Sequence, residues 1–326
     1  MQKIRWGIIS TGGIANAFAT ALNHLDDAEI VAVGSRDQAS ADAFGDKHNI
    51  PRRYASYEEL AHDPDLDVVY IGTPHNFHAA NMQLCLNAGK HVLCEKAFTI
   101  NAAQAEACVA LARQKGLFVM EAMWMRFLPS IVQVRQWLAE GIIGELREVR
   151  ANFNVRLPYN PEGRIYNPAL GGGALLDVGI YPVSFASMVL GQPETVIGQA
   201  VIGETGVDEQ ESMFFTYASG AWAQLSCGVH LDVPTVATIV GSKGYIYLHE
   251  RFFCTQRVTL SLAGKEAQTY DIGYAHNGLG YEAQEVHACL RAGRVESSIM
   301  PLDESIAILR TTDALRAQWG IQYPDE

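Results

Sequence analysis

The chain opens with a short apolar run, a glycine-containing turn and an amphipathic stretch, and this order recurs through its first third. Ile4 to Ile9 predicts a strand, Ser10-Thr11-Gly12-Gly13-Ile14-Ala15 a turn, and Ile14 to Leu25 a helix. Further strands and helices are expected alternately at Ile30–Gly34, Gln38–His48, Val68–Ile71, Ala79–Asn87, His91–Cys94, a helix capped by Asn101, and Phe118–Glu121. This alternation is typical of βαβ units, so the sequence predicts an α/β domain with a doubly wound parallel sheet.

Beyond residue 122 the pattern becomes that of an α+β domain. A helix is expected from Pro129 to Glu140, and turn signals such as Ser219-Gly220 then separate alternating segments. The strands expected there include 146–153, 195–202, 211–217, 221–228, 236–240 and 245–249. We therefore expect one domain over residues 1–122 and a second, with an open and mostly antiparallel sheet, over 123–326. The last helix, about Leu302 to Trp319, could pack back on the first domain.

Composition narrows the class of partner. The chain has 24 basic and 36 acidic residues, a net charge of −12, and is 48% hydrophobic. It lacks the basic surface that nucleic acid or an anionic membrane requires, so small molecules are the expected partners. Six cysteines without paired metal-type spacing are expected to be reduced, and the absence of a basic and apolar leader favours a cytoplasmic location.

The first turn has the chemistry of a phosphate-binding loop. It fits the pattern GxGxxG/A with Ser10 in place of the first glycine and Ala15 in place of the last. Gly12 would allow the backbone to approach a pyrophosphate, and the helix N-terminus would supply unpaired N–H groups. The turn therefore predicts a dinucleotide site, with a plain strand-to-helix turn as the alternative. The residues expected to contact the cofactor here are Ser10, Thr11, Gly12, Gly13 and Ile14.

The end of the second expected strand favours NADP over NAD. An NAD enzyme usually places an acidic side chain there for the ribose hydroxyl, whereas this chain has Ser35 and Arg36. A hydroxyl and a planar guanidinium suit a 2′-phosphate. In the competing interpretation Arg36 is simply solvated, and Asp37 caps the next helix while also touching the ribose.

Two further segments are candidates for the chemistry. Motifs of serine hydrolases, P-loop enzymes and zinc proteases are absent from the sequence, and so is the Tyr-x-x-x-Lys pair of short-chain dehydrogenases. One candidate is Glu95-Lys96, expected at the carboxyl end of a strand, where open α/β sheets bind ligands. The other is a glycine loop, Gly171-Gly172-Gly173, that leads into a helix with Asp177 and Tyr181 four residues apart on one face.

Five segments together resemble the Gfo/Idh/MocA oxidoreductases over essentially the whole chain. They are Trp6–Ser10, Thr73-Pro74 with His78, Glu95-Lys96, Met120–Phe127 and Gly172–Tyr181. The similarity is greatest to the branch that contains dimeric dihydrodiol dehydrogenase and NADP-dependent D-xylose dehydrogenase. It implies a Rossmann domain, a substrate-binding sheet domain, and a homodimer or higher oligomer through the flat sheet face.

The resemblance also implies roles for individual residues. Lys96, Asp177 and Tyr181 match the active-site positions. Residues on the cofactor side are Thr73, Pro74, Asn76, His78, Glu95, Lys96, Trp124 and Arg126, with Arg126 either reaching a phosphate or pairing with a carboxylate. Trp124 and Phe153 are expected to line the substrate pocket with Asp177 and Tyr181. The family usually has proline after the lysine, whereas this chain has Ala97, and an X–Ala bond tolerates the cis form poorly.

Alcohol oxidation supplies an independent chemical argument. Loss of a hydride to nicotinamide requires removal of the hydroxyl proton, and a phenol with the ordinary pKa near 10 becomes a better base beside an ammonium group. We therefore expect Tyr181 as acid/base, Lys96 as its assistant and Asp177 as an acceptor for a second substrate hydroxyl. His75 and His78 lack a third ligand, so no metal is expected. Weaker candidates for substrate contact are Arg156, Arg164, Tyr166, His230, Tyr274 and His276.

The resulting hypothesis is an NADP-dependent oxidoreductase that transfers a hydride between nicotinamide and a hydroxyl or carbonyl group. Its expected substrate is a small sugar, polyol, vicinal diol or dicarbonyl, in either direction. Two alternatives come from other classes: a dinucleotide-binding sugar sensor without catalysis, and a nicotinamide-dependent glycosidase.

Overall fold

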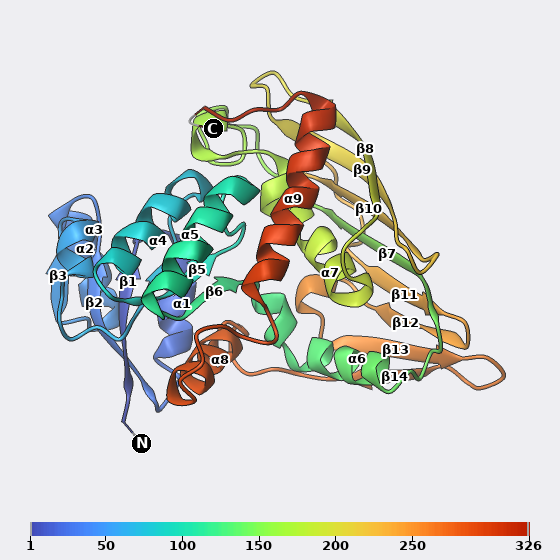
Figure 1. Ribbon diagram of the computed structural model, residues 1–326, viewed down its shortest axis with the longest axis horizontal. Coiled ribbons are helices and arrows are strands. Elements are labelled where there is room, and N and C mark those ends of the chain that lie inside the picture. Colours follow the sequence, from blue (N-terminus) through green and yellow to red (C-terminus); the bar gives the residue numbers. More distant parts are fainter. Residues whose placement is uncertain (1, 325) are drawn as a thin grey trace. The chain divides into compact units, whose positions relative to one another are not determined.

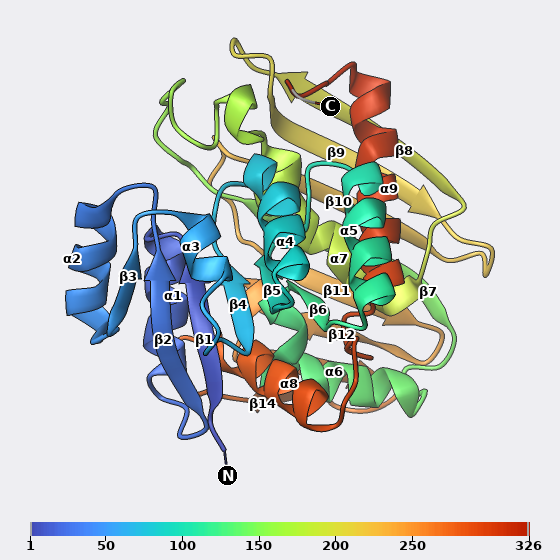
Figure 2. The same cartoon turned by 60° about the vertical axis from the view of Figure 1, so that its left-hand side comes forward.

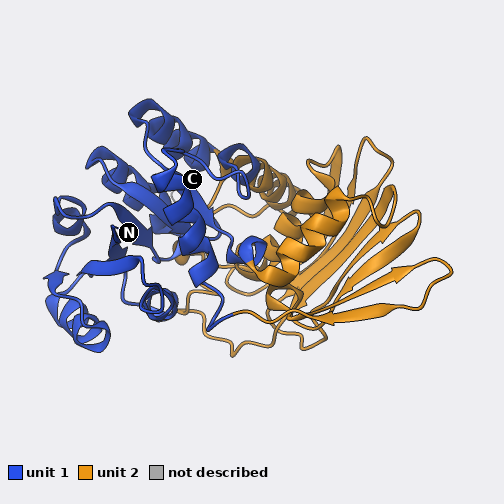
Figure 3. Cartoon of the chain, turned by 90° about the horizontal axis from the view of Figure 1, so that it is seen from below, with its two compact units in different colours: residues 1–99, 103–127, 275–305 blue, residues 100–102, 128–274, 306–326 orange. Residues whose placement is uncertain are grey.

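The computed structural model describes residues 2–324 and 326, which form two compact units (Figure 3). Unit 1 comprises residues 1–99, 103–127 and 275–305, and unit 2 comprises 100–102, 128–274 and 306–326. The sequence suggested one boundary at residue 122, but the chain returns to unit 1 after the second sheet. Most of the last helix lies in unit 2, and it is the preceding helix that belongs to unit 1.

Unit 1 contains a six-stranded parallel sheet in the order β3-β2-β1-β4-β5-β6 (Figure 1). Its strands are β1 Ile4–Ile9, β2 Ala28–Gly34, β3 Arg52–Tyr54, β4 Val68–Ile71, β5 His91–Glu95 and β6 Val119–Ala122. The central strands are almost wholly buried, because helices cover both faces of a doubly wound sheet. The expected α/β fold is confirmed; β3 was missed because three half-buried residues carry little periodic signal.

Six helices connect or cover these strands (Figure 2): α1 Gly13–Leu22, α2 Gln38–His48, α3 Tyr57–Ala61, α4 His78–Asn87, α5 Ala102–Lys115 and α8 Gly280–Arg291. Right-handed crossovers place helices on opposite faces where the strand order reverses, between β1 and β4. The sequence analysis expected four of them and missed α3 and α8. The reversal brings the carboxyl ends of β1, β2, β4 and β5 to one edge, the usual ligand edge of such sheets.

Unit 2 contains an eight-stranded sheet in the order β14-β13-β12-β11-β7-β10-β9-β8. Its strands are β7 Leu146–Asn154, β8 Thr195–Ile202, β9 Asp208–Thr216, β10 Trp222–Gly228, β11 Ala237–Gly241, β12 Gly244–Leu248, β13 Arg257–Leu262 and β14 Gln268–Asp271. All neighbouring pairs are antiparallel except β7 and β10, which run parallel. The predicted mostly antiparallel sheet is therefore confirmed.

The helices of unit 2 lie on one side of this sheet in Figure 1: α6 Pro129–Ala139, α7 Ile180–Leu190 and α9 Leu302–Trp319. On α9, Gln318 accepts a hydrogen bond from the Gly198 amide of β8 and donates one to the Val196 carbonyl. The segment Pro168–Leu190 is long and apolar enough by composition to span a membrane, but 78% of its apolar window is buried inside the protein. Such burial is typical of a core helix.

The edge strand β6 of the unit 1 sheet carries a buried carboxyl group. Glu121 of β6 is 1% exposed, and burial raises its pKa to about 7, although Ser305 and Arg126 favour the charged form. A folded-state pKa above the unfolded value means that the folded protein binds this proton more tightly. Its contribution to stability is therefore present at low pH and is lost as the pH rises toward 7.

Replacing Glu121 by glutamine removes this titration while keeping the shape of the side chain. We expect the melting temperature of the natural protein, relative to Glu121→Gln, to fall as the pH rises from about 5 to about 8. Calorimetry at several pH values measures this difference. A difference that does not change with pH would contradict the assignment.

Candidate active site

The turn between β1 and α1 has the backbone of a dinucleotide-binding loop. Ser10 has φ of 103°, in the region that favours glycine, which agrees with its alignment on the first glycine of the pattern. Gly12 is the N-cap of α1, with no side-chain cap and no acidic residue in the first turn. A Cβ on Gly13 would meet nothing within 4 Å. The helix N-terminus is thus open to a phosphate, and the residues present fit a dinucleotide.

The three polar residues that follow β2 differ in burial and in role. Asp37 is the N-cap of α2, and its carboxylate accepts a hydrogen bond from the Ser40 amide at 2.8 Å, which lowers the pKa of Asp37. Ser35 is buried, whereas Arg36 is exposed. The capping part of the competing interpretation is therefore what the structure shows. Arg36 lies between the end of β2 and this cap, in the segment where a 2′-phosphate is expected.

His78 links the two loops that follow β4 and β5. Its imidazole is fully buried, with Nδ1 2.8 Å from the Ala97 carbonyl and Nε2 2.7 Å from the Thr73 carbonyl. Burial lowers the pKa of His78, while the two carbonyls act in the opposite direction. A side chain without exposed surface does not touch a ligand, so His78 positions Thr73 and the Lys96–Ala97 segment rather than contacting the cofactor. The Lys96–Ala97 peptide bond is cis.

Glu95, which was expected on the cofactor side, is also buried, and it supports the loop that follows β5. It is 4% exposed and accepts hydrogen bonds from the Tyr70 hydroxyl at 2.6 Å and the Lys96 amide at 3.2 Å. Glu282 of α8 is fully buried nearby, and burial together with the charge of Glu95 holds the pKa of Glu282 well above its usual range. The sequence analysis missed Glu282, because nothing local marks a helical glutamate as buried.

The segment after β6 carries Trp124 and Arg126 in a short 3-10 turn, Trp124–Phe127. The Arg126 guanidinium is 1% exposed and pairs with Glu304 at 2.7 Å, with a longer contact of 3.4 Å to the Ile299 carbonyl. Of the two interpretations of Arg126, the structure supports pairing with a carboxylate, because a buried guanidinium that is already paired with Glu304 is not accessible to a phosphate. Trp124 is partly exposed.

In unit 2 the glycine loop leads into a π-helical turn, Leu175–Gly179, before α7 begins. The sequence predicted an ordinary helix here; π turns are rare and frequently occur at functional sites. Asp177 lies on this turn and accepts a hydrogen bond from Arg164 Nη1 at 2.7 Å. Arg164 was only a weak candidate for substrate contact, and the structure makes it the partner of Asp177.

Tyr181, on the first turn of α7, lies in an aromatic cluster. Its ring centroid is 5.5 Å from that of Phe153 and 5.0 Å from that of Phe253, and these two phenylalanine rings stack at 4.4 Å. Tyr181 is 7% exposed, so its phenol is held in a mostly apolar setting. Phe253 was not predicted, since no motif distinguishes it from an ordinary core residue.

The remaining candidates do not form one group. Thr73 is buried, Pro74 and Asn76 are partly exposed, and all three lie in the loop after β4. In unit 1, the rings of His276 and His24 stack with their centroids 3.6 Å apart. In unit 2, His230 Nδ1 lies 3.4 Å from Glu209 Oε2, and the His230 backbone forms an isolated antiparallel β-bridge with Arg156. Within residues 2–324 and 326, no three histidine, cysteine, aspartate or glutamate side chains are placed to hold a metal.

Comparison with known proteins gives the class of this chain. Residues 4–123 match the family model described as "Oxidoreductase family, NAD-binding Rossmann fold", and residues 131–247 match the "GFO/IDH/MocA C-terminal domain". The fold and the turn after β1 therefore belong to an oxidoreductase that binds a nicotinamide dinucleotide. The chain is a member of the Gfo/Idh/MocA family, as its motifs predicted.

Relatives of known activity cover its whole length. The chain is 40% identical to trans-1,2-dihydrobenzene-1,2-diol dehydrogenase of Mus musculus over 100% of this chain and 99% of the relative, and equally to that of Homo sapiens. A solved 3-ketoreductase from Actinomadura kijaniata, in complex with NADP and TDP-benzene, is 28% identical, with a TM-score of 0.87 over 97% of this chain and 98% of that one. These relatives are dehydrogenases and reductases, and the chain is accordingly an NAD(P)-dependent enzyme.

Proposed function

We propose that the protein is an NADP-dependent dehydrogenase or reductase that uses Tyr181 as acid/base with the assistance of Lys96. The observation that carries this proposal is the setting of Tyr181: a phenol in an aromatic cluster, one helical turn from an Asp177 that Arg164 holds in place. Lys96 follows β5 at the ligand edge of the unit 1 sheet. A lysine and a tyrosine are also replaced in solved variants of the Actinomadura ketoreductase.

The residues of this chain would move the proton, while bound nicotinamide supplies or accepts the hydride. In the oxidative direction Tyr181 accepts the proton of the substrate hydroxyl, and in the reductive direction it returns that proton to the carbonyl oxygen. The Lys96 ammonium stabilises the charge on the phenol and on the reacting oxygen. Asp177 accepts a hydrogen bond from a neighbouring substrate hydroxyl, and Phe153 covers the apolar side of the pocket.

The proposed substrate is a small molecule with adjacent oxygens: a sugar, a polyol, a vicinal diol or a dicarbonyl. An acidic acceptor close to an acid/base phenol suits two neighbouring hydroxyl groups. The names of the relatives agree with this class, since one group acts on a dihydrodiol and the ketoreductase on a ketone.

NADP is the proposed cofactor. Asp37 is engaged as the cap of α2, and Arg36 is exposed beside it, so the guanidinium is accessible to a 2′-phosphate. The Actinomadura structure contains NADP, which supports the same preference.

Replacing Arg36 by alanine tests this preference. We expect Arg36→Ala to weaken NADP binding by roughly tenfold or more, the scale of a lost charge-assisted hydrogen bond, while NAD affinity changes little. Fluorescence titration with both reduced nucleotides measures the two dissociation constants. Equal weakening of both would reject the 2′-phosphate role.

Replacing Tyr181 by phenylalanine tests the acid/base role. We expect Tyr181→Phe to reduce kcat by roughly two to four orders of magnitude while NADP(H) affinity stays within about twofold, because only the proton-transfer group is lost. Absorbance at 340 nm with sugars, diols and dicarbonyls gives the turnover. Near-normal turnover of the variant would overturn the assignment.

The same screen separates the two alternative classes. A sugar sensor would bind the nucleotide and show no turnover with any substrate in the panel. A nicotinamide-dependent glycosidase would release a sugar from a glycoside without net change in absorbance at 340 nm. Net reduction or oxidation of the free nucleotide is the outcome that the proposal requires.

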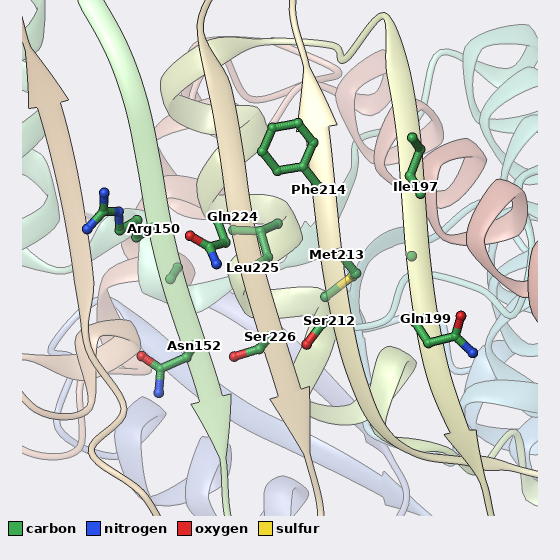
Figure 4. A pocket seen from close by; sticks show the side chains of 12 residues that line it. Arg150, Asn152, Ile197, Gln199, Ser212, Met213, Phe214, Gln224, Leu225 and Ser226 are labelled. Atoms are coloured by element: carbon green, nitrogen blue, oxygen red, sulfur yellow. The ribbon is translucent and has the colours of Figure 1, made fainter.

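We also propose that the helix-free face of the unit 2 sheet forms a homodimer. Ile197 of β8 and Phe214 of β9 are a cross-strand pair on this face and are 62% and 40% exposed (Figure 4). Val201 of β8 is also exposed, and exposed apolar side chains gathered on one face are typical of a protein interface. Polar side chains of Gln199, Ser212, Gln224 and Ser226 lie near the pair on the same sheet in Figure 4.

A charge placed in this face should prevent association. We expect Phe214→Glu to convert the protein from dimer to monomer in light scattering, whereas Val132→Glu, at an exposed position of α6, should leave the mass unchanged. A natural protein that is monomeric at micromolar concentration would contradict the proposed interface.

A further inference from the structure

Two acidic side chains of β9 lie in the interior of unit 2. Asp208 and Glu211 are 0% and 1% exposed, and neither has been given a role so far. Carboxyl groups are almost never fully buried unless they are hydrogen-bonded to a partner. Their partners therefore show what this pair does in the fold.

Asp208 holds the start of the π-helical turn that carries Asp177. Its Oδ2 accepts a hydrogen bond from the Leu175 amide at 2.5 Å, at the first residue of that turn. Gly173, with φ of 116°, lies so close that an added Cβ would come within 2.4 Å of Asp208 Oδ1. The glycine loop is thus shaped to admit this carboxylate and bring it to the beginning of the helix, where a negative charge is favourable.

Glu211 is connected to the other end of the π turn through Cys227. It accepts a hydrogen bond from the Cys227 thiol on the neighbouring strand β10, with which it is in register. A Cβ on Gly179, the last residue of the π turn, would come within 2.6 Å of that sulfur. The first residue of the turn is therefore hydrogen-bonded to Asp208, and the last residue packs against Cys227. Glu211 lies between these two side chains and links them.

One proton is needed between the two carboxyl groups. Asp208 Oδ1 and Glu211 Oε1 are buried and lack a donor from any other described side chain. Two ionised carboxylates would repel each other there, whereas one protonated group donates to the other. Burial raises the pKa of both carboxyl groups, and the charge of Asp208 raises that of Glu211 further, so the pair favours sharing one proton.

The C-terminal segment faces the same loop. The Tyr323 hydroxyl donates to the Gly172 carbonyl at 2.6 Å, and Arg316 of α9 pairs with Asp313 and Glu326 at 2.7 Å each. Arg316 also favours the charged form of Asp208. The titratable or charged groups that face the pair are thus Cys227 from β10, and Tyr323 and Arg316 from the C-terminal segment.

We propose that Asp208 is a positioning residue for the reaction: its side chain, which accepts a hydrogen bond from the Leu175 amide and lies against Gly173, fixes the π turn and thereby the placement of Asp177 and Tyr181. This inference rests on the proposed roles of those two residues. Asp208 touches neither substrate nor cofactor, because it has no exposed surface. Its loss should therefore lower kcat without changing the affinity for nucleotide, which is bound by unit 1.

The test compares Asp208→Ala with Asp208→Asn at a temperature where both are folded. Alanine removes the acceptor for the Leu175 amide, so we expect kcat to fall by at least about tenfold, with NADP(H) affinity within about twofold and an altered pH profile of kcat. Asparagine keeps an acceptor for the Leu175 amide, and its own N–H takes the place of the shared proton as the donor between the two side chains, so it should restore kcat to within about threefold. Asp232→Ala, at an exposed loop position, is the matched control.

Three results would overturn the inference: a folded Asp208→Ala enzyme with natural kcat, an asparagine variant as impaired as the alanine variant, or a loss confined to thermal stability. If Asp208→Ala does not fold, Asp208→Leu decides by the same criteria, since leucine fills the space of the side chain but offers no acceptor to the Leu175 amide. Tyr181→Phe is measured in parallel. Full turnover by Tyr181→Phe rejects the proposed function, whereas an inactive Tyr181→Phe with a fully active Asp208→Ala rejects only the positioning role.

Discussion

Burial of carboxyl groups beneath the reactive segments is the constraint on which the candidate site depends. Burying a carboxyl group costs free energy that hydrogen bonds offset, and two of these groups accept backbone hydrogen bonds from the segments proposed to carry the chemistry. In unit 1, Glu95 accepts from Tyr70 and from the Lys96 amide. In unit 2, Asp208 accepts from the Leu175 amide at the start of the π turn. Each of the two segments proposed to carry the chemistry is therefore hydrogen-bonded to a buried acid of its own sheet, and we assign these acids a positioning role.

The same principle separates motif residues that meet a ligand from those that support the loop. His78 and Arg126 stand at positions that the family resemblance assigned to the cofactor side, yet both are buried and engaged with protein groups. Gly12, Gly13 and Arg36 are exposed at the ligand edge of the unit 1 sheet. The first group holds the backbone of the loops, and the second is available to phosphate. A sequence motif contains both kinds, and only burial distinguishes them.

Much of the fold could be predicted from the sequence, because strands and helices of ordinary length have clear periods. The alternating first third, the turn at Ser10 to Ala15 and the antiparallel character of the second sheet all follow from local pattern. Short elements such as β3 and α3 have too few residues for a period, and the π turn differs from a helix by hydrogen bonds that no local pattern reveals. Glu282, Phe253 and Asp208 could not be predicted, since their partners lie far away in the chain and are brought together only by folding.

The central claim is that Lys96 and Tyr181 act on the same substrate oxygen, and a double-mutant cycle tests it most directly. The kcat values of Lys96→Met, Tyr181→Phe and the double variant are measured at saturating NADP and substrate. Residues that act as a unit are strongly non-additive, so the double variant should be no more than about threefold slower than the slower single variant. A double variant whose loss equals the product of the two single losses would show that the residues act independently and would contradict the account.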